Sequence, residues 1–131
     1  MVIKNSLEHA HHNYRACNFI SQKSEYSDWC ITIAFYAAIH YIRYLMLPCI
    51  DLGTTYNTFE SLFRVKKIQG EGRHGYQLRY VKDHYPEIDY EYAKLHDMSN
   101  NARYIDYKYG RDEAKQAKRY LNKIKDFAEK K

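Results

Sequence analysis

The sequence predicts an all-α domain, an antiparallel bundle of about five helices, and three observations carry this prediction. Apolar residues recur every three or four positions over most of the chain, the spacing of a helix with one buried face. No segment of useful length alternates apolar and polar residues as a half-buried strand does. The 131 residues are 45% hydrophobic and 28% charged and contain no linker, so residues 1–131 are expected to form a single domain.

The first two helices are expected near the start of the chain. Helical spacing of apolar residues begins at Leu7 and continues to about Gln22, and Ser24 and Ser27 are candidate N-caps for the next helix. This second helix has apolar residues on two opposite sides, Trp29, Ile33, Tyr36, Ala37, His40 and Tyr44 on one and Ile31, Phe35, Ile39 and Ile42 on the other. A helix that is apolar nearly all round belongs in the middle of a bundle.

The later helices are separated by glycine and proline. Pro48 and Gly53 interrupt the chain before a short helix expected to begin near Asn57. A glycine-rich connection then leads to helical stretches over 76–84 and 88–98, which Pro86 separates. The last helix has the clearest pattern, with apolar residues at Ala114, Ala117, Leu121, Ile124 and Ala128.

Composition limits the cellular setting and the partners. A net charge of +5 favours an anionic partner such as RNA without requiring one, because the basic residues alternate with acids as on a solvated helix face. Three cysteines without a CxxC pair, and an N-terminus without an apolar leader, indicate a cytoplasmic protein with reduced thiols. The longest apolar stretch, 29–47, is too polar for a membrane span, so no membrane association is expected.

Two segments resemble the HEPN domains, in particular their small stand-alone prokaryotic members. The run Ser-Glu-Tyr-Ser-Asp-Trp at 24–29, followed by Phe-Tyr-Ala-Ala-Ile-His-Tyr at 35–41, is similar to the second helix of that family. The stretch 92–104, with Leu95, Ser99 and Ala-Arg-Tyr at 102–104, is similar to its second signature. The resemblance covers most of the chain. It implies a HEPN-like helical bundle that forms a homodimer, with an RNA-cutting site at the dimer cleft in many relatives and none in many others.

The resemblance implies a specific catalytic pair in the active relatives, an arginine followed four to six residues later by a histidine, with no metal required. Arg79 and His84 have this spacing, although Tyr80 stands where a polar residue is usual. The histidine would move protons at the ribose 2′-hydroxyl or the leaving oxygen, and the arginine would hold the scissile phosphate. About one pair at this spacing is also expected by chance in a chain of this composition.

A second candidate site combines His40 on the central helix, His74 after the glycine-rich connection, and Arg103. If the bundle brings them to one cleft, they too would place a proton-transfer group beside a phosphate-holding arginine. The alternative is that His40 is a hydrogen-bonded core residue and Arg103 an ion-pair partner.

Tyrosines and arginines between positions 73 and 104 are candidates for RNA binding. Tyrosine rings can stack on unpaired bases beside basic residues, and the candidates are Arg73, Tyr76, Tyr80 and Tyr104. The alternative is that these rings fill the core or an interface. His9 and His12 share one helical face, but nothing completes a ligand set, so neither a metal nor another cofactor is expected.

Two hypotheses of function therefore stand. In the first, the chain is a HEPN-type domain of a toxin or defence system that acts on RNA, as a metal-independent endoribonuclease with its site at a homodimer cleft. In the second, it is a catalytically silent helical module that binds another protein, such as a nucleotidyltransferase or an antitoxin. A cleavage assay in EDTA separates them.

Overall fold

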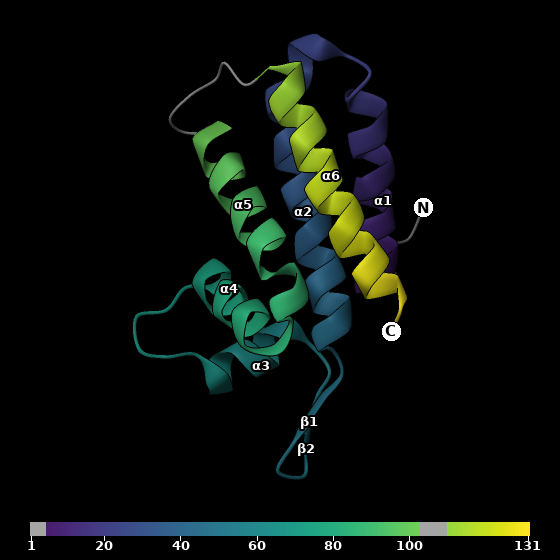
Figure 1. Cartoon of the computed structure of the whole chain (residues 1–131). Coiled ribbons are helices and arrows are strands. Elements are labelled where there is room, and N and C mark those ends of the chain that lie inside the picture. Colours follow the sequence, from purple (N-terminus) through teal and green to yellow (C-terminus); the bar gives the residue numbers. More distant parts are fainter. Residues whose placement is uncertain (1–4, 103–109) are drawn as a thin grey trace.

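A computed structural model describes residues 5–102 and 110–131 and confirms the predicted all-α bundle. Four helices lie side by side and form the body of the bundle, and two further helices and a small hairpin lie at one end of them (Figure 1). The helices of the body are α1 (Ser6–Ile20), α2 (Ser27–Met46), α5 (Asp89–Asn100) and α6 (Arg111–Glu129). At the end lie β1 (Cys49–Asp51), β2 (Thr54–Tyr56), α3 (Phe59–Lys66) and α4 (Arg73–His84), and short 3-10 turns cover Ser24–Tyr26 and Pro86–Ile88.

Local sequence explains where several helices begin. The Asn5 side chain caps α1 by accepting a hydrogen bond of 2.9 Å from the backbone N–H of Glu8. Thr58 caps α3 in the same way, accepting from the N–H of Ser61 at 3.2 Å. The N-cap position of α2 is Tyr26, which makes no side-chain capping hydrogen bond, so the candidate Ser27 is the first residue of the helix and not its cap.

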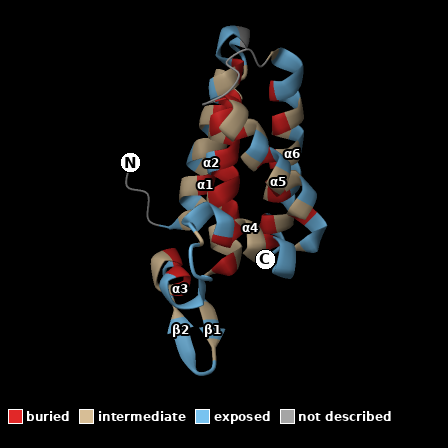
Figure 2. Cartoon of the chain, turned by 90° about the vertical axis from the view of Figure 1, so that its left-hand side faces the viewer, coloured by how far each residue is buried: buried red, intermediate tan, exposed pale blue. Residues whose placement is uncertain are grey.

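Helix α2 is the centre of the bundle, because it packs against α1, α5 and α6. Buried residues run along its length (Figure 2). One stripe nevertheless faces solvent, with Trp29 56% and Tyr36 37% exposed. The prediction that α2 lies in the middle of the bundle is therefore confirmed, although one apolar stripe of this helix is left uncovered.

The other differences between prediction and structure concern the number of helices and the end of the bundle that carries the hairpin. The described residues form six α-helices rather than about five, and they include an antiparallel hairpin that the sequence pattern does not reveal. Its strands are three residues long, too short to show alternation. Its turn, Leu52-Gly53, has positive φ at both positions, 48° and 82°, as a type I′ turn requires.

No described helix combines the length and the apolar character that crossing a bilayer requires.

Candidate functional site

The strongest candidate site is a cavity of about 370 Å³ where the start of α1, the end of α2 and the start of α3 meet. We call it the histidine cleft. Its lining residues are Asn5, Ser6, His9, His40, Arg43, Leu47, Asn57, Thr58, Phe59 and Glu60. Its volume falls in the range of small-ligand sites, roughly 300–1,000 Å³. The cleft holds two imidazoles and one guanidinium.

The two imidazoles of the cleft stack on each other. The ring centroids of His9 on α1 and His40 on α2 lie 3.6 Å apart, with 18° between the ring planes. Burial, His9 and Arg43 lower the pKa of His40 to about 4. Burial, His12 and Arg43 also lower the pKa of His9. Both rings are therefore neutral at pH 7, and each presents one N–H donor and one bare nitrogen acceptor.

Arg43 brings a fixed positive charge to the cleft. Its guanidinium lies over the ring of Phe59, 4.0 Å from the centroid, and its Nε donates to Oε1 of Gln77 at 3.1 Å. Gln77 is buried on α4 and donates from Nε2 to the carbonyl of Ile39 at 3.0 Å. These contacts fix the position of the guanidinium.

The charge of Arg43 is not neutralised directly. Among the described residues, no carboxylate lies within 4.0 Å of its nitrogens, and burial lowers the pKa of Arg43. A half-buried cation without a carboxylate partner attracts an anion, because the anion restores the electrostatic stabilisation that burial removes.

The rim of the histidine cleft carries one acid and two helix ends. The carboxylate of Glu60 is paired with Arg73, whose Nη2 donates to Glu60 Oε2 at 3.0 Å. The first residues of α1 and α3 also line the cleft, so the N-terminal ends of two helices, which carry the positive ends of their dipoles, lie beside it. The histidine cleft therefore combines hydrogen-bond donors and positive potential, the properties that suit a phosphate group.

A second cavity, of about 380 Å³, contains the pair predicted from spacing. We call it the hairpin cleft, because the hairpin, α3 and α4 form it. Its lining residues are Cys49, Ile50, Asp51, Leu62, Lys66, Tyr76, Arg79, Tyr80, Asp83 and His84. The structure thus brings Arg79 and His84 to one cavity, together with two of the tyrosines proposed to bind RNA.

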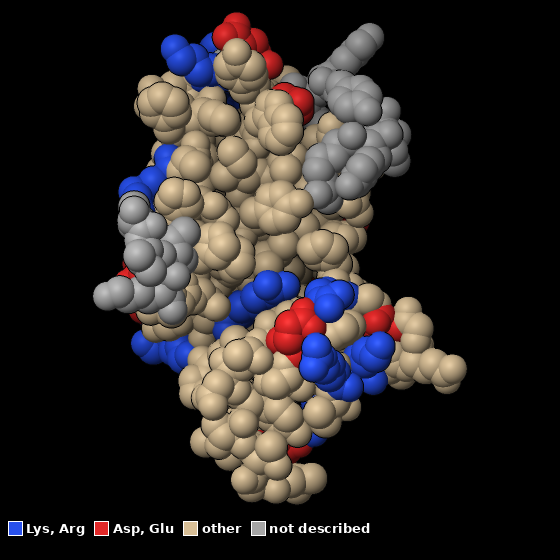
Figure 3. All heavy atoms as spheres, turned by 180° about the vertical axis from the view of Figure 1, so that it is seen from behind, with Lys and Arg blue, Asp and Glu red and all other residues tan. Residues whose placement is uncertain are grey.

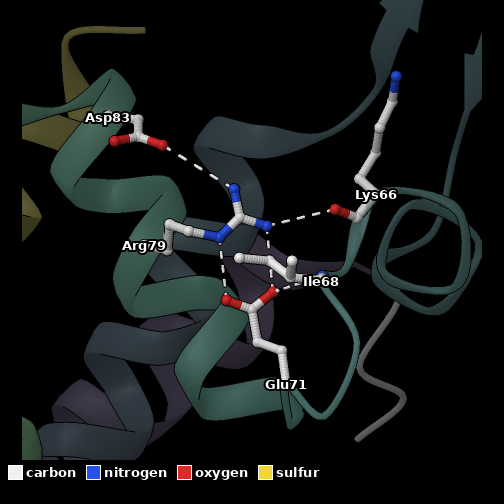
Figure 4. A network of polar contacts seen from close by, with 5 residues as sticks. All are labelled: Lys66, Ile68, Glu71, Arg79 and Asp83. Atoms are coloured by element: carbon white, nitrogen blue, oxygen red, sulfur yellow. Dashed lines mark hydrogen bonds and ion pairs between the residues drawn. The ribbon is translucent and has the colours of Figure 1, made fainter.

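Arg79 is engaged in a network of contacts within the chain (Figure 4). Its Nε and Nη2 donate to the two carboxylate oxygens of Glu71 at 2.9 and 3.0 Å, and Nη2 also donates to the carbonyl of Lys66 at 3.2 Å. Asp83 lies 4.0 Å from Nη1. A phosphate held by Arg79 would have to compete with this bidentate carboxylate, so the geometry favours a structural role for Arg79.

The aromatic residues of the hairpin cleft also contact one another. His84 is exposed and stacks on Tyr80, with centroids 4.1 Å apart. Tyr76 is 2% exposed and packs against Phe59 and Phe63, so it belongs to the core. The alternative that tyrosine rings fill the core therefore holds for Tyr76, while Tyr80 is half-buried at the cleft.

The second predicted constellation is divided in the structure. His40 lies in the histidine cleft, whereas the exposed His74 lies near Phe35 and His96, with ring centroids 5.6 and 6.0 Å away. Arg103 and Tyr104 lie outside the described residues. Arg73 is exposed and paired with Glu60 at the rim of the histidine cleft.

Sequence reasoning weighed His9 only as a metal ligand and did not select Arg43, and both residues line the histidine cleft. Arg43 follows His40 by three positions, so their shared helical face was visible in the sequence. No sequence signal links His9 to His40, because the packing of α1 against α2 brings them together. Within the described residues, no group of three or more His, Cys, Asp or Glu side chains is placed to hold a metal ion.

Searches of protein-family models, curated proteins and solved structures found no match to this chain.

Proposed function

We propose that this chain is a HEPN-type domain that binds RNA at the histidine cleft and cleaves it without a metal. One observation carries the proposal: His9, His40 and Arg43 share a cavity in which the guanidinium has no carboxylate partner among the described residues. A backbone phosphate supplies the missing negative charge. The resemblance to HEPN domains, with the net charge of +5, favours RNA as the source of that phosphate.

The cleavage step uses a neutral imidazole as the base. At pH 7 His40 takes the proton of the ribose 2′-hydroxyl, the 2′-oxygen attacks the adjacent phosphorus, and the bond from phosphorus to the 5′-oxygen breaks. Arg43 stabilises the charge that builds on the phosphate oxygens. Because both imidazoles are neutral at pH 7, neither is a protonated acid, and water protonates the departing 5′-oxygen.

The test measures binding and cleavage of a single-stranded RNA of mixed sequence by the full chain in EDTA. Arg43→Gln is expected to weaken binding about tenfold and to lower the slope of log affinity against log salt by about one. His40→Ala is expected to abolish cleavage. His84→Ala is the matched control, because this histidine lies in the other cleft, and it is expected to leave both properties unchanged. Cleavage lost in His84→Ala and retained in His40→Ala would move the activity to the hairpin cleft.

A second candidate function, a silent helical module that binds a protein, has its own supporting observation. The face over α2 carries few charged side chains, whereas Lys, Arg and acids gather around α3 and α4 (Figure 3). Depletion of charge with exposed aromatic residues is typical of the core of a protein interface. The same surface suits the predicted homodimer. Binding of a partner protein by a chain that neither binds nor cleaves RNA would favour this second function.

A further inference from the structure

Two cysteines that the proposed function does not use face each other inside the bundle. Cys17 in the last turn of α1 and Cys30 in the first turn of α2 have their sulfur atoms 3.5 Å apart. Each thiol also approaches the backbone carbonyl of the other residue, at 3.6 and 3.9 Å. A disulfide bond is about 2.05 Å long, so a short movement of two side chains joins them.

We propose that Cys17 and Cys30 are a redox-active pair that hydrogen peroxide converts to a disulfide between α1 and α2. Both thiols are 0% exposed, but both lie within one helical turn of the connection that joins the two helices. Helix ends open more easily than helix centres, and peroxide is small enough to enter there. The third cysteine, Cys49, lies on β1, away from this pair.

The chemistry follows from the contact between the thiols. Their hydrogen bond lowers the pKa of Cys30 and raises that of Cys17, and the Lys118 ammonium on α6 further favours a thiolate. The Cys30 thiolate attacks one peroxide oxygen, the O–O bond breaks, and a sulfenic acid and hydroxide form. The Cys17 thiol then attacks the sulfenic sulfur, the S–O bond breaks and water leaves. Two thiols and one peroxide thus give one disulfide and two waters, with sulfur oxidised and peroxide reduced.

The bond would tie together the two helices that carry the histidine cleft. Cys17 and Cys30 are 13 positions apart, so the disulfide closes a short loop around the connection between α1 and α2. Closing such a loop restricts the unfolded chain, and the oxidised protein is expected to melt roughly 5–10 °C higher than the reduced protein. A thiol reductant would reverse the change.

The test treats the folded, reduced full chain with hydrogen peroxide and then counts free thiols. The expected count falls from three to one, the chain stays monomeric on a non-reducing gel, and peptide mass spectrometry finds Cys17 joined to Cys30. Cys49→Ser should lose its two remaining thiols at the same rate, and Cys30→Ser should form no intramolecular disulfide. Retention of all three thiols, or a disulfide that includes Cys49, overturns the proposal. If both single variants unfold, the peptide map of the unaltered chain decides.

Discussion

Gln77 on α4 is the buried link between α4 and α2: it accepts from Arg43 Nε at 3.1 Å and donates to the carbonyl of Ile39 at 3.0 Å. Arg43 and Ile39 are four positions apart on α2, so one amide group spans one turn of that helix. The histidine cleft therefore depends on a residue that does not line it.

Gln77→Leu is expected to destabilise the fold by about 1–3 kcal/mol, because it removes the hydrogen bonds that a buried carbonyl and a half-buried guanidinium make to the amide group. Urea unfolding measures the change. Gln116→Leu is the matched control, since Gln116 accepts from the exposed Arg119 on the same helix, and a cost under about 0.5 kcal/mol is expected there. Equal costs for the two variants would contradict the role assigned to Gln77.

The depressed pKa of His40 predicts a loss of stability in mild acid. The unfolded imidazole titrates near 6.5 and the folded one at about 4, so between these values the unfolded state binds more protons. The contribution of His40 to the free energy of unfolding is therefore fully present above pH 6.5 and declines as the pH falls toward 4. Because His40 is only half-buried, we expect about 1–2 kcal/mol from this residue after allowance for solvent screening.

Unfolding of the wild type and of His40→Gln at several pH values isolates this contribution. The difference in free energy of unfolding between the two proteins should change between pH 6.5 and 4 and stay constant above pH 7. Part of the acid sensitivity remains in the variant, because the pKa of His9 is lowered as well. If the difference in free energy of unfolding between the two proteins does not change with pH, the lowered pKa of His40 in the stacked pair is contradicted.

The pair of Arg79 and Glu71 is expected to stabilise the connection between α3 and α4 rather than to act on RNA. Arg79→Ala should cost about 1 kcal/mol, within the range of a partly exposed bidentate pair. A double-mutant cycle with Glu71→Gln measures the coupling, and Asp83→Asn is the control, because Asp83 lies at 4.0 Å. Loss of RNA cleavage in Arg79→Ala with unchanged stability would restore Arg79 as a catalytic residue.

The exposed stripe of α2 predicts where the proposed homodimer would form its interface. Trp29 and Tyr36 lie on this stripe with Ile33 between them, one face of the helix that no described element covers fully. Trp29→Glu is expected to shift the chain from dimer to monomer at micromolar concentration, because it places a charge in an apolar interface. Analytical ultracentrifugation measures the mass, and Tyr90→Glu, at another exposed tyrosine on α5, should leave it unchanged. A wild type that is monomeric throughout would exclude this interface.

Local sequence patterns predicted where the helices lie better than they predicted which neighbours cover each helix. The apolar spacing of 114–128 identified α6, because the five apolar residues that define this spacing share one buried face. The hairpin was missed, since two strands of three residues carry too little pattern. For α2, composition showed that the helix is central, but not that its Trp29 stripe stays open, because exposure depends on which neighbours cover the helix.

By itself the sequence determined the fold class and the order of the helices, because helical periodicity is local and recorded in neighbouring residues. It also marked His40, Arg79 and His84 as candidates by residue type and spacing. Only the tertiary structure decided their surroundings: it joined Arg79 to Glu71, and it placed His9 on His40 although 31 positions separate them in the chain. Contacts between distant segments arise from packing, so the spacing of residues along one helix does not contain them.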